Sequence, residues 1–240
     1  MDIYSNIRTS IAENKRLLAV LIDPDKMELD NVEAVVAKIN QSIATHIFVG
    51  GSEVDEGVTE TIVKAVKQHT KLPIILFPGD ISQITNEADG ILFLSLISGR
   101  NPDYLIGKHV EAVSKLSKTQ LEVLPTGYIL IENGKQTAVE RVSNTKPLDR
   151  SNIQHIIDTA RAGEFLGMKL IYLEAGSGAT YPVEPEIISA VKEELSIPLI
   201  VGGGIRTKAQ LEAAYNAGAD LVVIGTAFEN NQHFFEQQKL

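Results

Sequence analysis

Short apolar runs, each followed by a stretch with helical periodicity, recur along the chain. Several of these runs are continuously apolar, such as LLAVLI, LIYL, PLIV and LVVI. Unbroken apolar strands are typical of a parallel sheet that helices bury on both faces. The expected strands span residues 17–23, 46–52, 73–78, 90–96, 121–131, 170–174, 199–203 and 221–225.

Between these strands, apolar residues at i, i+3 and i+4 spacing predict helices. The alternation predicts right-handed βαβ units, and eight strands predict an α/β fold of the (β/α)8 TIM-barrel type. An open doubly wound sheet is the alternative, which we rate lower because no strand precedes a G-x-G-x-x-G turn. The expected helices span residues 32–39, 59–69, 105–116, 153–167, 186–195 and 209–218.

Two intervals depart from an ideal barrel. The third and fourth strands leave room for little more than one turn of helix, around residues 82–87, so we expect a shortened helix there. After the fifth strand there is surplus chain, in which Asn133–Gly134 lies between alternating runs and predicts an inserted hairpin. Without an internal repeat or linker, residues 1–240 are expected to form a single domain.

Composition narrows the possible classes of protein. The 240 residues are 44% apolar and contain no cysteine, which suits one large core without disulfides. A formal net charge of -9 and no basic stripe argue against a nucleic-acid partner. The polar N-terminus predicts no signal peptide, and no apolar run is long enough for an integral membrane segment. We therefore expect a cytoplasmic enzyme-sized domain, and a small anionic substrate remains compatible with its charge.

Glycine-rich turns follow the last three expected strands, at residues 175–178, 202–207 and 225–228. In a barrel these turns converge on the C-terminal face, where active sites lie and where loops seven and eight often bind phosphate. Glycines let the backbone approach an anion closely, and backbone N–H groups can point at it. The alternative is that they only make tight turns. Three such turns on one rim favour a phosphate site.

A pair of carboxylates, Asp23 and Asp25, ends the first strand, and Ser52 ends the second. Oxygen ligands of this type suit Mg²⁺, which takes one or two carboxylates plus phosphate oxygens and water. A polar loop capped by an aspartate explains the same residues equally well. The sequence by itself leaves both interpretations open.

Glu174 ends the apolar strand LIYLE directly before the first glycine-rich turn. A carboxylate beside a phosphate site is positioned to accept a proton from a substrate hydroxyl. A salt-bridged residue at the barrel rim is the alternative, and it is the commoner fate of such a glutamate. The five histidines lack the spacing of a zinc site.

The chain resembles the geranylgeranylglyceryl phosphate synthases and their bacterial relatives, the PcrB-like prenyltransferases. The resemblance covers essentially the whole length. GGGIR and IGT recur in many phosphate-binding barrels, whereas LIDPDK, ISGRNPDYLIG and YLEAGSG together are far more specific. The other motifs of the resemblance are IFVGGS, PIILFPG, LPTGYILIENG and VVIGTAFE, in chain order.

The resemblance implies transfer of a prenyl group, of geranylgeranyl type, from an allylic prenyl diphosphate to the sn-3 hydroxyl of sn-glycerol 1-phosphate. It implies Asp23 and Ser52 as ligands of the cofactor Mg²⁺ and Glu174 as the group that orients or deprotonates that hydroxyl. Leu21 departs from the Gram-positive branch, which carries a phosphate-contacting lysine there. The implied substrate-binding residues are Tyr172, Leu173, Glu174, Ala175, Gly176, Ser177, Gly178, Gly203, Gly204, Gly225 and Thr226.

A prenyl tail needs an apolar groove, and the shortened region before the fourth strand, near Ile97, Tyr104 and Leu105, is our candidate for it. Two other functions stay open. A sugar-phosphate isomerase would need an acid/base pair and no metal, and a non-catalytic barrel would bind phosphate ligands only. A homo-oligomer is expected because barrels of this type commonly pair through outer helices. Prenyl length cannot be predicted from the sequence.

Overall fold

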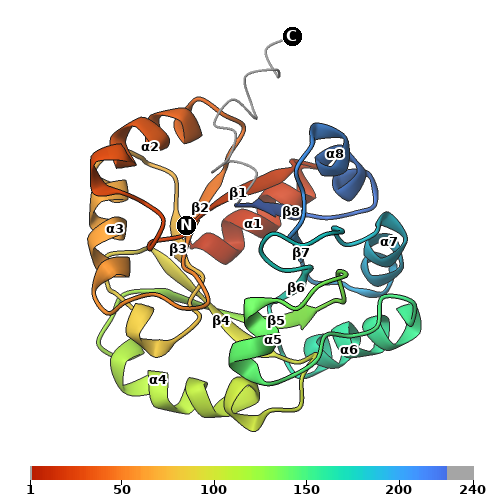
Figure 1. Cartoon of the computed structure of the whole chain (residues 1–240). Helices are drawn as coiled ribbons and strands as arrows, with labels where there is room; N and C mark the ends of the chain where they lie inside the picture. The colour runs from red at the N-terminus through yellow and green to blue at the C-terminus, as the bar shows by residue number, and fades with distance from the viewer. Residues whose placement is uncertain (1, 226–240) are drawn as a thin grey trace.

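Eight parallel strands close into one barrel in the computed structural model, which describes residues 2–225 (Figure 1). Each strand pairs with its neighbour in sequence, and β8 returns to pair with β1. The predicted TIM-type barrel is therefore confirmed. The strands are β1 (Leu17–Ile22), β2 (His46–Val49), β3 (Ile74–Leu76), β4 (Gly90–Leu96), β5 (Glu122–Leu130), β6 (Leu170–Glu174), β7 (Leu199–Gly202) and β8 (Leu221–Ile224).

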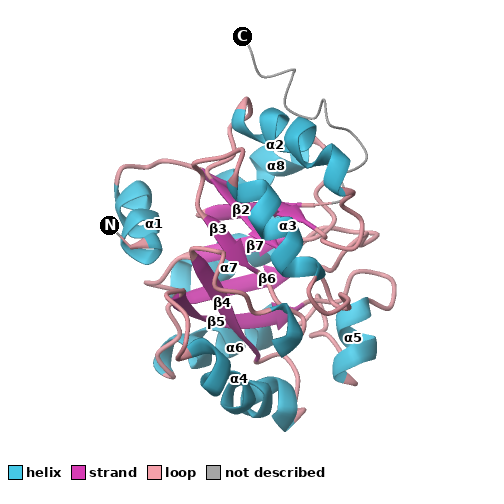
Figure 2. Cartoon of the chain, turned by 90° about the vertical axis from the view of Figure 1, so that its left-hand side faces the viewer, coloured by secondary structure: helices cyan, strands magenta, loops and turns pink. Residues whose placement is uncertain are grey.

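Helices surround the barrel on its outside (Figure 2). Their apolar stripes face the strands, as in α3, where Ile62, Val63 and Val66 are buried and the lysines are exposed. The helices are α1 (Ile3–Ala12), α2 (Val32–Asn40), α3 (Val58–Lys67), α4 (Lys108–Leu116), α5 (Ala138–Ser143), α6 (Ile153–Phe165), α7 (Pro185–Glu194) and α8 (Lys208–Asn216). None of the helices described is long and apolar enough to cross a membrane.

The core has two layers because side chains alternate along each strand. On β6, Leu170 and Tyr172 point into the barrel, whereas Ile171 and Leu173 pack against the outer helices. The inner layer is filled by large side chains, so the barrel is a packed core and not a pore. A site can therefore form only where this inner layer ends, at the rim.

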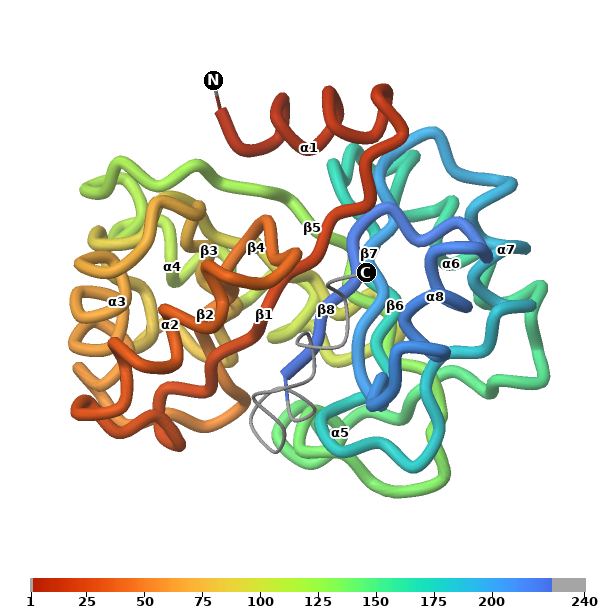
Figure 3. Tube along the Cα trace, turned by 90° about the horizontal axis from the view of Figure 1, so that it is seen from above, coloured from red at the N-terminus to blue at the C-terminus, as the bar shows by residue number. Residues whose placement is uncertain are grey.

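Helix α1, which the sequence analysis did not predict, covers one end of the barrel (Figure 3). Ile7 is 2% exposed and belongs to the inner core layer. The backbone N–H groups of Ile3 and Tyr4, at the first turn of the helix, donate to the carboxylate of Glu122 at the start of β5. Helix α1 thus covers the N-terminal ends of the strands, and the main cavity of the described structure lies at the opposite rim.

The shortened helix between β3 and β4 is confirmed as a single 3-10 turn, Ile81–Gln83. Two lysines of α4 reach across to this turn. Lys108 forms an ion pair with Asp80 at 2.6 Å, and Lys115 donates to the carbonyls of Ile81 and Ser82. The α4 helix therefore takes over part of the cover that a full helix would supply.

The predicted hairpin after β5 is wrong. No antiparallel strand pair follows β5 in the described part of the chain, and Asn133 is buried and donates from its side chain to the carbonyl of Ala175. A capping box, Thr137 with Glu140, starts helix α5 instead, and the chain returns in parallel to the barrel at Leu148. The capping box therefore marks the start of a helix where a second hairpin strand was expected. The assignment of residues 1–240 to one domain stays a prediction.

Candidate active site

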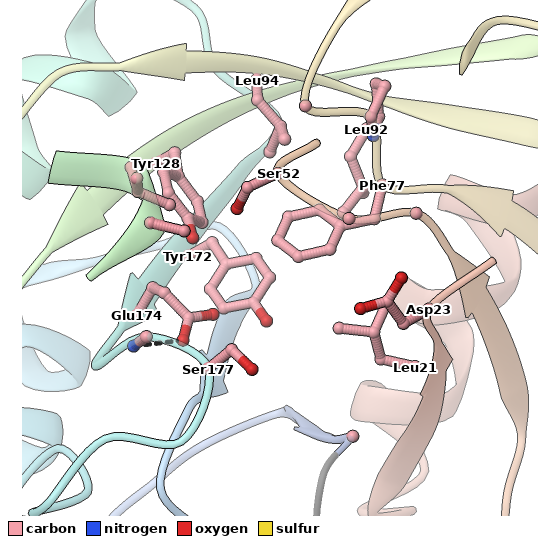
Figure 4. Close-up of a pocket in the computed structure, with 18 of the residues that line it drawn as sticks. Leu21, Asp23, Ser52, Phe77, Leu92, Leu94, Tyr128, Tyr172, Glu174 and Ser177 are labelled. Carbon is pink, nitrogen blue, oxygen red and sulfur yellow. Dashed lines mark hydrogen bonds between the residues drawn. The ribbon is translucent and has the colours of Figure 1, made fainter. Parts of the chain in front are cut away.

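A cavity of about 410 Å³ lies at the C-terminal ends of the strands and spans the barrel rim. Figure 4 shows Asp23 on one side of it and Glu174 with Ser177 on the other, with the rings of Phe77 and Tyr172 between them. The first two strands and the last three therefore contribute to one cavity. This arrangement is the one on which the sequence-based hypothesis depends.

Glycine-rich loops form one wall of the cavity, on the side of β6, β7 and β8. Gly176, Gly178, Gly203 and Gly204 all have positive φ, between 64° and 99°, a region that disfavours other residues. These conformations turn the backbone sharply at the strand ends. Such loops present N–H groups to an anion without any basic side chain. The wall is suited to bind a phosphate group.

Glu174 lies beside these loops and is 5% exposed. Its Oε1 accepts a hydrogen bond of 2.5 Å from the backbone N–H of Gly176. Burial raises the pKa of Glu174 to about 7, and the Gly176 hydrogen bond only partly opposes this rise. No salt bridge to Glu174 is found among residues 2–225, so the alternative of a salt-bridged rim residue does not apply. A carboxylate with such a pKa can take up a proton near neutral pH.

Aromatic rings form the floor of the cavity. Tyr172 stacks on Phe77 with ring centroids 5.4 Å apart and meets Tyr128 edge to face at 5.3 Å. Burial, and next the nearby Glu174 charge, raise the pKa of both tyrosines well above the usual value, so both hydroxyls stay protonated. The buried Tyr172 hydroxyl has no hydrogen-bond partner in the described part of the chain. A ligand oxygen would satisfy it.

Asp23 follows β1 at the opposite wall. Its carboxylate forms an ion pair with Lys26 at 2.7 Å and packs against Gly51, the residue before Ser52. Gln83, 2% exposed, holds both backbone groups of Gly51, donating to its carbonyl at 2.8 Å and accepting from its N–H at 3.4 Å. The short turn after β3 thus fixes the loop after β2 beside Asp23.

The donor set at this wall fits a hard divalent cation. A carboxylate that already attracts an ammonium group, and a serine hydroxyl that lines the same cavity, offer oxygen ligands of the kind that Mg²⁺ prefers. No group of three or more histidine, cysteine, aspartate or glutamate side chains is close enough to hold a metal within residues 2–225. A cation here would therefore need substrate oxygens and water to complete its coordination. That requirement suits a diphosphate substrate.

An apolar branch of the cavity runs between the short turn after β3 and helix α4. It is the space that a full helix between β3 and β4 would fill. Tyr104, from the expected groove, lines the cavity, whereas Ile97 and Leu105 do not. Ile97 packs in the outer core layer instead. The residues that make up the branch were not predicted from the sequence, and they are Ile81, Ile84, Ile91, Phe93, His109 and Ala112.

Ion pairs and hydrogen bonds hold the rim of the cavity. Arg141 on α5 pairs with Glu53 after β2. Lys108 pairs with Asp80, and its hydrogen bond to Asp80 raises the pKa of Lys108. Arg206 donates to the carbonyls of Gly178 and Ala179. These contacts span different elements, and no local sequence pattern could have indicated them.

Most of the predicted site residues lie around this one cavity. Leu173 and Ala175 do not line it. Leu173 packs in the outer core layer. The backbone N–H of Ala175 donates to the carbonyl of Gly202, and the carbonyl of Ala175 accepts from the side chain of Asn133. Thr226 lies outside the described residues. The predicted residues that line the cavity are Asp23, Ser52, Tyr172, Glu174, Gly176, Ser177, Gly178, Gly203, Gly204 and Gly225. Their roles stay predictions.

Comparison with known proteins agrees with this geometry. The model of the PcrB family matches residues 9–239, which is nearly the whole chain. The chain belongs to the PcrB family. Leu21 lies against Gly225 in the cavity of this family member.

Two relatives and one solved structure that resemble this PcrB-family chain are named geranylgeranylglyceryl phosphate synthase. The geranylgeranylglyceryl phosphate synthase of Flavobacterium johnsoniae is 57% identical over 234 residues, covering 98% of this chain and 96% of the relative. That of Thermococcus kodakarensis is 42% identical over 218 residues, covering 90% and 86%. The crystal structure of (S)-3-O-geranylgeranylglyceryl phosphate synthase from Thermoplasma acidophilum, in complex with its substrate sn-glycerol-1-phosphate, matches with a TM-score of 0.92 at 33% identity, covering 98% and 95%.

Proposed function

We propose that this PcrB-family chain transfers a prenyl group, of geranylgeranyl type, from its diphosphate to the sn-3 hydroxyl of sn-glycerol 1-phosphate. The single observation that carries the proposal is the joint placement of Glu174, the glycine loops and Asp23 around one cavity with an apolar branch. The names of relatives that are similar over nearly the full length agree with it.

The acceptor, sn-glycerol 1-phosphate, would bind at the wall formed by β6, β7 and β8. The backbone N–H groups around Gly176–Gly178, Gly203–Gly204 and Gly225 would hold the phosphate. The sn-3 hydroxyl would then face Glu174, and the unpartnered Tyr172 hydroxyl would donate to an acceptor oxygen. This wall would therefore hold the acceptor in position beside the donor, and such positioning contributes strongly to catalysis of a two-substrate reaction.

The donor, a prenyl diphosphate, would place its diphosphate beside Asp23 and Ser52 and its tail in the apolar branch. Mg²⁺, which Asp23 and Ser52 would hold, supplies neutralisation of the charge that develops on the leaving diphosphate. Phe93 and Ala112 offer the tail an apolar wall. The diphosphate and the tail thus occupy chemically different parts of the same cavity.

In the reaction, the bond between C1 of the prenyl group and the diphosphate oxygen breaks, and the diphosphate leaves with the electron pair. The sn-3 oxygen forms the new ether bond to C1, and its proton passes to Glu174. Burial holds the pKa of Glu174 at about 7, high enough for the carboxylate to keep that proton during the step. Glu174 is therefore the general base of the proposed mechanism.

A sugar-phosphate isomerase is not favoured, since among residues 2–225 Glu174 is the one acidic side chain that is deeply buried at the cavity, whereas Asp23 on the opposite wall is paired with Lys26. The names of the relatives also give no support to it. Activity that survives a chelator would support it. We also propose that the chain forms homo-oligomers.

The test is incubation with sn-glycerol 1-phosphate, Mg²⁺ and a series of prenyl diphosphates of increasing length. Mass spectrometry should detect the ether product and show which length is preferred. A parallel reaction with excess chelator should give no product. Absence of ether product with every prenyl diphosphate, from protein that is folded by circular dichroism, would overturn the proposal.

A further inference from the structure

We infer that Asn133 is a positioning residue of the acceptor site, which holds the glycine-rich loop of residues 175–181 in the shape that binds the substrate phosphate and seats Glu174. This inference rests on the proposed function and deepens it, since it gives the buried amide after β5 a part in the reaction. Asn133 is 1% exposed. A polar side chain buried this deeply needs hydrogen-bond partners within the protein.

The side chain and the backbone of Asn133 contact opposite ends of this loop. Its Nδ2 donates to the carbonyl of Ala175, and its backbone carbonyl accepts from the N–H of Tyr181 at 3.3 Å. Between these two anchors lie residues 176–178, which line the cavity. One residue therefore fixes both ends of the segment that would bind the phosphate.

The orientation of the Asn133 amide is itself fixed. Its Oδ1 accepts from the backbone N–H of Lys135 at 3.3 Å, so its Nδ2 faces Ala175. A flipped amide would place oxygen against oxygen at Ala175 and donor against donor at Lys135. The N–H of Ala175 donates to the carbonyl of Gly202 at 3.0 Å. The first residue of the loop is therefore tied both to β7 and to the chain after β5.

Thr137 supports the same loop by packing. A Cβ atom on residue 176 would be 2.4 Å from Cγ2 of Thr137, so this methyl group lies directly over Gly176. Thr137 is 4% exposed, and its hydroxyl caps α5 by accepting from the N–H of Glu140 at 3.2 Å. Because the cap uses the hydroxyl, the methyl group is the part of Thr137 that faces the loop.

The consequence for the reaction passes through Gly176. Its N–H donates to Oε1 of Glu174, and this hydrogen bond opposes the rise in the pKa of Glu174 that burial causes. Without the hold of Asn133 on the loop, Gly176 could move away from the carboxylate. The phosphate would then lose part of its N–H groups, and the pKa of Glu174 would rise further. Asp23 lies on the opposite wall (Figure 4), so the donor should bind as before.

The experiment separates the hydrogen bond of Asn133 from its packing. Asn133→Leu keeps a branched side chain of similar shape without a donor, and Thr137→Ser keeps the cap of α5 but removes the methyl group. Asn40→Leu is the control. The Asn40 amide also donates to a backbone carbonyl, that of His69 at 2.7 Å, but at an exposed position outside the cavity.

Four quantities are measured for each protein. Calorimetry gives the affinity for sn-glycerol 1-phosphate, and steady-state kinetics give the KM of both substrates and the pH profile of kcat/KM. Hydrogen exchange, followed by mass spectrometry, gives the protection of the amides of residues 175–181. Urea unfolding reports the stability of each variant separately from these readouts.

Asn133→Leu should bind sn-glycerol 1-phosphate about tenfold more weakly, with a similar rise in its KM, because a buried carbonyl loses its donor. The KM of the prenyl diphosphate should stay unchanged. The rise of kcat/KM with pH should move to higher pH than in the wild type, and residues 175–181 should exchange faster. Thr137→Ser should change the acceptor affinity in the same direction by about fourfold, as the loss of one buried methyl group implies. Asn40→Leu should match the wild type.

Two results would overturn the inference. If Asn133→Leu is less stable in urea but has the acceptor affinity and pH profile of the wild type, Asn133 only supports the fold. Equal rises in the KM of both substrates would show a general distortion of the cavity. If Asn133→Leu does not fold, Thr137→Ser decides between the same outcomes. Failure of the proposed function looks different, since the wild-type protein would then form no ether product, while hydrogen exchange would still report whether Asn133 holds the loop.

Discussion

The carboxylate of Glu174 lies directly against the backbone of Gly203. A Cβ atom on residue 203 would be 2.3 Å from Oε1 of Glu174 and 2.5 Å from the backbone nitrogen of Gly176. Gly203 also has a φ of +82°. The buried glutamate and the phosphate loop can therefore share this space only because residue 203 is glycine.

Gly203→Ala should lower kcat/KM by roughly a hundredfold, because displacement of a reacting group by about 1 Å has effects of that size. Steady-state kinetics with sn-glycerol 1-phosphate as the varied substrate measures this change. Gly57→Ala is the matched control, since Gly57 has the same φ of +82° but no atom within 4 Å of the added methyl group. Equal losses of activity in both variants would show that backbone strain, and not the contact with Glu174, is responsible.

Glu174→Gln should lower kcat by about 100- to 10,000-fold, which is the usual contribution of a general base. In the wild type, kcat/KM should rise with pH through about 7, as Glu174 loses its proton in the free enzyme. The variant should lose this rise. A pH profile that is the same for both proteins would remove Glu174 from the proton transfer.

The same variant should change stability in the opposite direction. The raised pKa of Glu174 means that the folded state binds a proton more tightly than the unfolded state, so its contribution to stability is lost as pH rises from about 4.5 to about 7. Glu174→Gln should therefore be more stable than wild type at pH 8, by up to about 3 kcal/mol, and should lose this advantage at pH 5. Urea unfolding at the two pH values measures the difference.

Asp23→Asn should lower turnover by roughly a hundredfold or more while the fold persists, since a metal contributes several kcal/mol to the stabilisation of developing charge. The measurement combines product formation at saturating Mg²⁺ with circular dichroism. Asp25→Asn is the control, because Asp25 lies two residues away and does not line the cavity. An unaltered rate for Asp23→Asn would remove our metal assignment.

Ala112 should limit the length of the prenyl tail. It faces the apolar branch from α4 and is 4% exposed, so a larger side chain there would fill the branch. Ala112→Leu should shift the preferred prenyl diphosphate to a shorter one, measured by competition between donors. Val113→Leu is the matched control, because the neighbouring Val113 is 56% exposed on the outer face of the same helix.

Tyr104 should affect the same selectivity. Its hydroxyl donates to the carbonyl of Val142 at 3.0 Å and links the apolar branch to α5. Tyr104→Ala should widen the branch and favour longer donors, whereas Tyr104→Phe should keep the ring and the selectivity. If neither replacement at Tyr104 nor the one at Ala112 changes the preferred length, the tail binds elsewhere.

The strands were predictable from the sequence because their apolar runs are continuous. The bounds of β4 and β6 agree with the prediction to the residue, and the other strands are shorter than expected by one to three residues at one or both ends. Helix α1 was missed, although Ile3, Ile7 and Ile11 recur every four residues, because the segment is otherwise polar. An apolar stripe this weak predicts a packed helix only when the barrel end that the helix covers is already known.

The site was predictable as far as it depends on strand ends. Glu174 and the glycine loops follow buried strands, and the barrel topology brings those ends together. Gln83 and the apolar branch could not be predicted, because each depends on contacts between segments that are distant in sequence. The hairpin was predicted wrongly since Asn133–Gly134 is a local signal, whereas Asn133 makes its contact with Ala175.

His46 should make the protein less stable in mildly acidic solution. It begins β2, is 3% exposed and has an Nε2 atom without a partner in the described structure, while its Nδ1 lies 2.8 Å from Oγ1 of Thr45. Burial lowers the pKa of His46 to about 4. At pH values between about 4 and 6.5, the unfolded chain therefore binds a proton at His46, whereas the folded chain does not.

The free energy of unfolding should therefore fall by about 2 kcal/mol between pH 7 and pH 5 through this residue. His46→Gln cannot titrate, so the difference between wild type and variant, measured by urea unfolding at each pH, isolates the contribution of His46 from that of Glu174. His69→Gln is the control, because His69 is exposed on the protein surface. A constant difference between wild type and His46→Gln over this pH range would show that the buried imidazole finds a partner for its proton.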